Sequence, residues 1–307
     1  MLWRITYASD PALTTRKECT IVLKKSGDYR RSKTAAQCRS RDGVPISFAA
    51  IRGNRNTMKR PISVQLYSLR ERTAADLAGV LKDLSAMGYK GVEPAGLAGK
   101  TAREVRKMAD DLGLVVSSAH SSLPTQDNVS EIVDTAKTLG YDYIISGLGG
   151  DAFRTMDAIK ASAEKFQAAA ELLKPHGLQM GYHNHWWEFD LVEGRYGYSR
   201  FLEGCPDVFS ELDVYWASNF NRVDVPLIVK AHQKQIKLLH IKDGPLVHGQ
   251  PHTAVGQGKM NIPDIVKAAG INTAWLVVEL DECASDMTQA VRDSFDYLKK
   301  TGMGVGR

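Results

Sequence analysis

The chain has 307 residues, of which 43% are apolar and 24% charged, a globular composition long enough for one large domain or two small ones. This composition excludes a collagen-like, wholly disordered or disulfide-framework chain, and no apolar run reaches the roughly 18 residues that a membrane helix needs. The four cysteines are scattered without a CxxC pair, which argues against a cysteine zinc site, whereas the net charge of +5 taken alone would hint at nucleic acid.

The positive charge is concentrated at the start of the chain. Residues 1–57 hold 12 Lys/Arg against 4 Asp/Glu, whereas residues 58–307 hold 28 against 31 and are mildly acidic. The first segment shows no helical or strand periodicity and no apolar core of a signal peptide. We therefore expect a basic, unstructured extension at 1–57 and a folded domain at 58–307.

From residue 58 onward, short β-rich segments alternate with amphipathic helical ones, and glycines follow several of the helices. The predicted strands are 62–69, 91–94, 114–118, 143–146, 178–182, 209–212, 236–239 and 275–278. The predicted helices are 73–87, 101–112, 129–139, 156–173, 198–202, 225–232, 262–269 and 288–299. Eight strand–helix units in about 250 residues predict an α/β fold, a single-domain (β/α)8 TIM barrel. A doubly wound sheet would show a glycine-rich turn after its first strand, and residues 67–70 are not one.

Polar side chains stand where the predicted strands end, which is the catalytic face of such barrels. Alone, Asp213 could cap a helix and His240 could be a core histidine. Several such residues on consecutive strands instead favour a divalent metal held by carboxylates and imidazoles. The strand-end residues are Gln65, Glu93, His120, Ser146, His183, His185, Asp213, His240 and Glu279.

The motifs around these positions resemble one known family. They read Gly-Tyr-Lys-Gly-Val-Glu93, Ala-His120-Ser, Tyr-His183-Asn-His185-Trp-Trp-Glu-Phe, Glu-Leu-Asp213-Val-Tyr-Trp216, His240-Ile-Lys242-Asp and Val-Val-Glu279. Over residues 60–302 the chain resembles the sugar phosphate isomerase/epimerase family of xylose-isomerase-like TIM barrels.

The resemblance implies one divalent ion held by residues from strands five to eight. Asp213, His240 and Glu279 match the last three ligands of the family. The first ligand is a Glu in the family and is His183 here, which resembles inosose dehydratases. His185 shares the strand face of His183 and is the alternative ligand. We expect Mn²⁺, with Co²⁺, Fe²⁺, Mg²⁺ and Zn²⁺ as alternatives.

The resemblance also implies proton transfer beside a carbonyl, with Glu279 as a catalytic carboxylate. Because the family epimerases use two opposed Glu residues and this chain keeps one, Glu188, His120 or Lys242 would supply the second acid–base group. The substrate would be bound by Gln65, Glu93, His185 and Trp216. Alternatively, Glu93 could pair with a basic residue deeper in the barrel, and Trp186, Trp187 and Trp216 could be packing residues.

The predicted function is a cytoplasmic, metal-dependent isomerase or epimerase of a keto sugar, with a small-molecule partner and no nucleic acid or membrane. A homo-oligomer is possible. The alternatives are a lyase on the same site, an abasic-site endonuclease and a non-catalytic sugar-binding barrel. An endonuclease would need more ligands and a basic surface. Residues 249–258 could form a phosphate cradle or a plain loop, with His248 and His252 expected to be solvated.

Overall fold

The computed structural model describes residues 59–307 and two short strands before them. These strands, β1 (Cys38–Arg39) and β2 (Pro45–Ile46), pair antiparallel. The chain divides into two units, Met1–Asn56 and Thr57–Arg307. Apart from β1 and β2, the expected unstructured extension at 1–57 falls outside the described residues.

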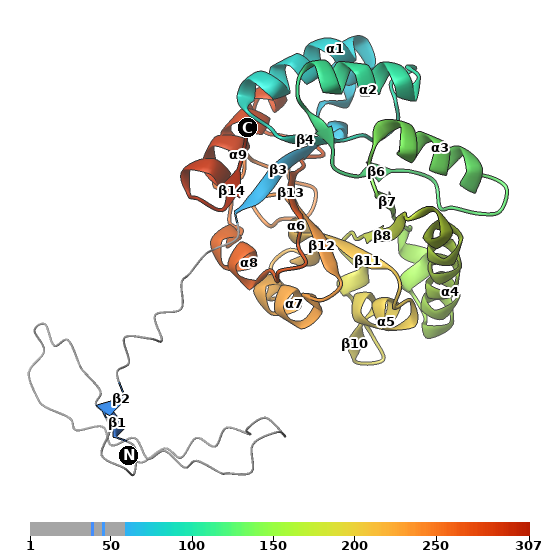
Figure 1. Cartoon of the computed structure of the whole chain (residues 1–307). Helices are drawn as coiled ribbons and strands as arrows, with labels where there is room; N and C mark the ends of the chain where they lie inside the picture. Colours follow the sequence, from blue (N-terminus) through green and yellow to red (C-terminus); the bar gives the residue numbers. More distant parts are fainter. Residues whose placement is uncertain (1–37, 40–44, 47–58) are drawn as a thin grey trace, which may run out of the picture. The chain divides into compact units, whose positions relative to one another are not determined.

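The second unit is a closed barrel of parallel strands, which confirms the predicted fold (Figure 1). Its strands are β3 (Arg60–Gln65), β4 (Gly91–Glu93), β5 (Val115–Val116), β6 (Ala119–His120), β7 (Tyr143–Ser146), β8 (Gln179–His183), β11 (Phe209–Asp213), β12 (Ile236–Ile241) and β13 (Trp275–Val278). The short strands β5 and β6 are two pieces of the third barrel strand. β5 pairs with β4 and β6 pairs with β7, so this interrupted strand closes the sheet.

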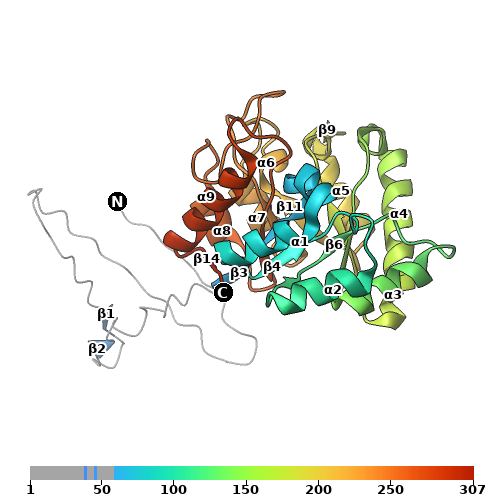
Figure 2. The ribbon, with the colours of Figure 1, turned by 90° about the horizontal axis from the view of Figure 1, so that it is seen from above.

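Helices surround the strands in the end-on view of Figure 1, and Figure 2 shows the same barrel turned by 90°, from its side. They are α1 (Arg70–Met87), α2 (Ala102–Asp111), α3 (Val129–Leu139), α4 (Met156–Leu173), α5 (Gly197–Gly204), α7 (Val225–His232), α8 (Ile262–Ala268) and α9 (Met287–Lys300). Local chemistry sets their ends: Thr101 and Glu104 form a capping box at α2, and left-handed Gly88 and Gly140 end α1 and α3. In the described part of the chain, no helix is long and apolar enough to cross a membrane.

Smaller elements complete the unit. The strands β9 (Leu191–Val192) and β10 (Arg195–Tyr196) form a hairpin before α5, and β14 (Gly304–Val305) pairs with β3. The short helix α6 (Val214–Ala217) follows β11 directly.

The first and third strands differ from their predicted bounds. The first was expected to run to residue 69, but it ends at Gln65 and a 3₁₀ turn occupies Leu66–Leu69. The Gln65 side chain causes this change because it accepts the backbone N–H of Tyr67 and so caps the turn. The third strand breaks at Ser117 and Ser118, whose hydroxyls bond to Val92 and Glu93 of the neighbouring strand.

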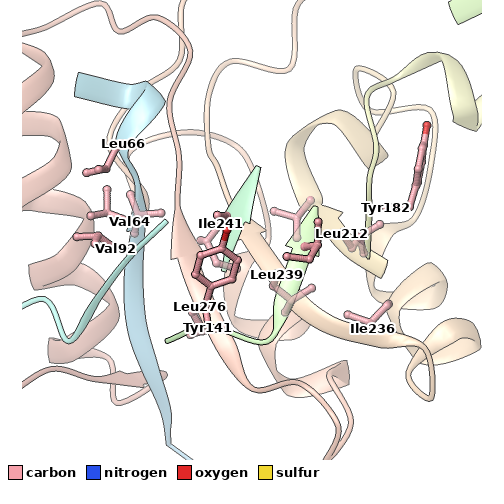
Figure 3. Close-up of a cluster of buried hydrophobic side chains, with 14 of the residues drawn as sticks. Val64, Leu66, Val92, Tyr141, Tyr182, Leu212, Ile236, Leu239, Ile241 and Leu276 are labelled. Atoms are coloured by element: carbon pink, nitrogen blue, oxygen red, sulfur yellow. The ribbon is translucent and has the colours of Figure 1, made fainter. Parts of the chain in front are cut away.

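Alternation along the strands separates an apolar outer layer from a polar interior. Tyr182, Leu212 and Leu239 are fully buried between strands and helices (Figure 3). Tyr182 packs on Phe166 of α4 and Phe201 of α5, with ring centroids 5.3 and 4.4 Å apart. The residues that follow these three along their strands are His183, Asp213 and His240, which therefore face the barrel interior.

Candidate metal and active site

The interior of the barrel changes from apolar to polar along β11 and β12. On β11 the interior face carries Phe209, then Glu211, then Asp213. On β12 it carries Leu238 and then His240, with Lys242 next in the same register. Phe209 and Leu238 pack with Ile145 as a small buried cluster. This apolar floor supports the polar residues above it at the carboxyl ends of the strands.

The four predicted metal ligands come together at this end. His183, Asp213, His240 and Glu279 are all buried, and each offers a ligand atom within 4.8 Å of the others. His183 and Asp213 end β8 and β11, His240 lies near the end of β12, and Glu279 follows β13. Two imidazoles and two carboxylates are a donor set that suits Mn²⁺, Fe²⁺, Co²⁺ or Zn²⁺.

Each of the two imidazoles also binds a carboxylate that was not predicted as a ligand. His183 Nδ1 lies 3.2 Å from Glu211 Oε2, and His240 Nε2 lies 2.8 Å from Glu93 Oε1. His240 presents its other nitrogen, Nδ1, to Glu279 at 2.9 Å. A histidine that donates one ring N–H to a carboxylate holds its second nitrogen in the orientation and tautomer that a metal requires.

Glu211 was missed in the sequence analysis. Its Oε2 lies 2.7 Å from His120 Nε2 and 3.1 Å from His240 Nε2, in addition to His183. Together these four residues form a second possible ligand group that shares two histidines with the first. The signal was present in the sequence, because Glu211 precedes Asp213 by two residues and must share its strand face.

Lys242 lies beside the candidate ligands and is fully buried. Its Nζ is 2.9 Å from carboxylate oxygens of Asp213, Glu279 and Asp281. Because all three N–H groups of the ammonium face carboxylates, Lys242 fixes the positions of these side chains. Burial disfavours the charged form, but the three carboxylates outweigh it and raise the pKa of Lys242 well above its usual value.

The cluster contains several buried carboxylates and only one lysine. This excess of negative charge raises the pKa values of two of its histidines. Burial opposes protonation of His120, but the charges and hydrogen bonds of Glu211 and Glu93 raise its pKa to about 10. The pKa of His240 is likewise raised well above its usual value, against burial, by Glu211, Glu279 and Glu93. By contrast, burial dominates at His183 and lowers its pKa.

A cation fits this cluster. Glu211 Oε1 is buried and has no hydrogen-bond partner among the described residues, and the buried Asp213 Oδ2 has only the Lys242 ammonium beside it, at 2.9 Å. A buried carboxylate oxygen without a partner carries a desolvation cost that a coordinated ion would remove. Asp213 also caps α6, because its Oδ1 accepts the backbone N–H of Trp216 at 2.9 Å. Both explanations of Asp213, helix cap and candidate ligand, therefore apply.

Gln65 and Glu93 lie below the ligands rather than at an open surface. Both are fully buried, and Gln65 Nε2 donates to Glu93 Oε1 at 2.6 Å. The remaining oxygen of Glu93 accepts the Ser118 hydroxyl. The partners of Glu93 are thus Gln65, Ser118 and the two histidines His120 and His240, not the Arg or Lys of the alternative prediction. This geometry suits Gln65 and Glu93 for orienting His240, and their predicted contact with sugar hydroxyls stays a prediction.

Glu188 is outside the two candidate ligand groups, and its predicted acid–base role stays a prediction without support from this geometry. It is fully buried, its Oε1 accepts the Tyr182 hydroxyl at 2.5 Å, and its Oε2 accepts the backbone N–H of His185 at 3.0 Å. Tyr182 faces the helices, so Glu188 closes the turn after β8 on the outer side of the barrel. Ser146 is also apart from the cluster, because its hydroxyl donates to the Ser121 carbonyl.

His120 and His185 remain partly open beside the buried ligands. Their side chains are 25% and 31% exposed, compared with 8% for His183. The imidazole of His185 stacks on Trp187 at 4.3 Å and meets His183 edge-on at 5.4 Å. These two histidines are therefore the imidazoles of the cluster that a substrate can reach from solvent.

Four aromatic side chains, Trp186, Trp216, Phe220 and His248, form a continuous group beside Lys242, here called the aromatic wall. The Lys242 ammonium lies 5.0 Å from the Trp216 ring centre, and Trp216 lies 5.0 Å from Trp186. Phe220 is 5.9 Å from Trp186 and 4.9 Å from His248. Trp216 lies in α6 and Phe220 in the turn after it, whereas Trp186 and His248 come from the loops after β8 and β12; all of these segments follow the carboxyl ends of barrel strands.

The loop after β12 is fixed by Asp243 and offers no phosphate cradle. The buried Asp243 carboxylate accepts the backbone N–H groups of Gly244, Gly256, Gly258 and Met260. The amides of Gly256 and Gly258 therefore already have an anionic acceptor. His252 was expected to be solvated but is only 3% exposed, and burial together with the Lys242 charge lowers its pKa to about 4.

Comparison with known proteins agrees with this architecture. A family model described as a xylose isomerase-like TIM barrel matches residues 81–301. The crystal structure of a sugar phosphate isomerase/epimerase from Parabacteroides distasonis is 27% identical, with a TM-score of 0.67, and the match covers 81% of this chain and 96% of that chain.

Two more distant structures share the fold. An L-ribulose 3-epimerase is 18% identical with a TM-score of 0.59, over 80% of this chain and 95% of that one. The IolI protein, solved with a bound zinc atom, is 13% identical with a TM-score of 0.61, over 80% and 99%. No curated protein matches the chain. Because the family model spans most of the barrel, the chain belongs to the xylose isomerase-like TIM barrel family.

Proposed function

We propose that this protein is a divalent-metal-dependent isomerase or epimerase of a keto sugar or sugar derivative, with Mn²⁺ as its ion. The observation that carries the proposal is the convergence of His183, Asp213, His240 and Glu279 within 4.8 Å on four consecutive barrel strands. The 27% identity to a sugar phosphate isomerase/epimerase supports the same reaction class.

The residues of the cluster have different roles in the proposed reaction. When bound, a divalent cation would polarise the substrate carbonyl and stabilise negative charge on its oxygen. Glu279 is the carboxylate that takes the proton from the neighbouring carbon, and Lys242 holds it in place at 2.9 Å. His120, partly exposed and bonded to Glu211, is the second proton carrier. Lys242 itself is assigned no proton transfer, since its three N–H groups face carboxylates.

A lyase reaction is the second candidate, and one observation favours it. Where the family's epimerases use two Glu residues, this cluster has Glu279 and His183. Removal of one proton followed by departure of a β-substituent needs a single carboxylate base and a separate acid for the leaving group. His120 and His185, both partly exposed, are available for that second role. The substrate would then be a keto-inositol or a 3-keto-glycoside.

Deuterium exchange tests the proposal and separates the two candidates. The Mn²⁺-loaded protein is incubated with 3-keto-glucosides and inososes in D₂O, and the products are followed by NMR and mass spectrometry. Deuterium at the carbon next to the carbonyl, without loss of water or aglycone, supports the isomerase. Release of an enone or an aglycone establishes the lyase instead. Absence of both with Mn²⁺, Co²⁺, Mg²⁺ and Zn²⁺ overturns the proposal.

Two variants test whether Glu279 is the catalytic base. Glu279→Gln should abolish exchange even when added Mn²⁺ saturates the variant in a metal titration, because an amide cannot accept the carbon-bound proton; recovery of exchange at high Mn²⁺ would show that Glu279 acts only as a ligand. Glu282→Gln is the matched control, since Glu282 is an exposed carboxylate three residues further along the same loop, and this variant should keep full exchange. Equal exchange in the two variants would remove Glu279 from the reaction.

A further inference from the structure

The aromatic wall extends beyond the reach of the metal ligands. Trp216 is its inner member, beside Lys242, and Trp186 follows. Phe220 and His248 lie farther out and contact Trp186 with ring centres 5.9 and 5.6 Å away. A monosaccharide held at Asp213 and Glu279 would meet Trp216 first, which leaves the outer part of the wall free for another group.

The backbone around Phe220 adopts an unfavourable conformation. Asn219, Phe220 and Asn221 have φ values of 42°, 55° and 70°, so three consecutive non-glycine residues adopt the left-handed conformation. Asparagine tolerates this region, but a bulky residue such as Phe rarely does. The Asn219 side chain holds the turn by donating to the Phe189 carbonyl and the Asp190 carboxylate. Strain of this kind persists where the surrounding structure enforces it, typically at ligand sites.

A buried polar group lies behind the wall. His252 packs edge-on against Trp216 with ring centres 5.3 Å apart. Its Nδ1 accepts the backbone N–H of Asp281 at 3.3 Å, so the hydrogen of the neutral ring is on Nε2. This Nε2–H is buried and has no partner in the described chain. Because this donor is buried behind Trp216, a ring on the front of the wall does not reach it, and the aromatic side chains of the wall carry the recognition.

We propose that the aromatic wall is a second subsite, which binds a ring joined to the keto sugar that reacts at the metal ligands. The substrate is therefore a glycoside with a ring-shaped aglycone rather than a free monosaccharide. This inference rests on the proposed function only in placing the reacting sugar at the cluster. The feature of the ligand that the wall would bind is a ring with an apolar face. Either an aryl group or a second sugar has such a face.

Binding of unreactive glycosides tests the subsite apart from catalysis. Methyl β-D-glucopyranoside, phenyl β-D-glucopyranoside and cellobiose are titrated into the full-length, Zn²⁺-loaded protein, and tryptophan fluorescence is followed. A ring stacked on the wall should tighten binding by about three- to tenfold over the methyl compound. Preference for the phenyl compound identifies an aryl group, and preference for cellobiose identifies a sugar.

Variants of the outer wall provide the control. Phe220→Ala and His248→Ala should remove most of the preference and leave the affinity for the methyl glucoside unchanged. Because His248 is exposed, its variant has no packing reason to misfold. Ile271→Ala, which shortens an 80% exposed apolar side chain on the α8–β13 loop at the opposite end of the barrel, should keep the preference.

Several results would overturn the subsite: equal or undetectable binding of the three glycosides, or an unchanged preference in both wall variants. The failure of the proposed function has a different signature. In that case deuterium exchange is absent while the ring preference persists. The reverse pattern, with exchange present and no ring preference, would remove the second subsite and retain the enzyme.

Discussion

The two overlapping ligand groups make different predictions about Glu211 and Asp213. If the ion binds to His183, Asp213, His240 and Glu279, Glu211 acts on it only through the imidazoles that it contacts at 2.7–3.2 Å. Loss of such an outer contact typically weakens metal affinity by about 10–100-fold. Asp213→Asn removes a charged ligand and should cost more, while its amide oxygen can still accept the Trp216 N–H and cap α6.

Thermal unfolding converts these affinities into measurable shifts. At a metal concentration 100 times the wild-type Kd, the ion stabilises the folded state by about 2.7 kcal/mol. For a domain of this size, that corresponds to a Tm increase of about 5–11 °C. At the same concentration, Glu211→Gln should retain about 0.4–1.4 kcal/mol, or about 1–6 °C. Asp213→Asn should retain less than about 1 °C.

The assay is the Tm of each protein with and without Mn²⁺, supported by calorimetric titration of the metal-free protein. Glu282→Gln, the exposed carboxylate control, should shift as the wild type does. The reasoning is refuted if Glu211→Gln loses the shift and Asp213→Asn keeps it. The ion would then occupy the group formed by His120, His183, Glu211 and His240.

Three further changes test the framework around the site. Lys242→Met leaves three buried or half-buried carboxylates facing one another. The free energy of unfolding of the metal-free protein, measured in urea, should therefore fall by about 3–5 kcal/mol. A decrease below about 1 kcal/mol would contradict the ion-pair geometry. Asp243→Ala removes the acceptor of four loop amides. Hydrogen exchange at the amides of Gly256 and Gly258 should become faster, whereas the amides of α8 should stay protected. Unchanged exchange at the two glycines would show that the loop does not depend on this carboxylate. Thr101→Ala breaks the capping box of α2 and should cost about 1 kcal/mol, with a null result pointing to compensation by Glu104 alone.

Much of the barrel could be predicted because its signals are local. Helices α3, α4 and α7 have the predicted bounds, since apolar spacing is readable along the chain and Gly140 marks the end of α3. The strand ends also brought four candidate ligands to one place, because parallel strands in a barrel share a carboxyl end. Glu211 was readable by the same logic, but it lies inside a strand rather than at its end.

What could not be predicted depends on contacts between distant segments. Glu188 follows two candidate histidines closely in sequence, yet the turn after β8 directs it to Tyr182 on the outer side of the strand. The amides of Gly256 and Gly258 look free in the sequence, and only the fold brings Asp243 to them. In both cases the hydrogen-bond partner, not the residue type, decides the role.

Asp213 is both a helix cap and a candidate metal ligand, and this limits how the sequence of the site can change during evolution. One oxygen fixes the backbone of Trp216 and the other faces the ligand cluster, so a substitution at this position changes the ion and the inner ring together. Phe220 and His248 carry no such link to the carboxylates. New substrates can therefore be accommodated by exchanging the outer rings while the catalytic chemistry is inherited intact.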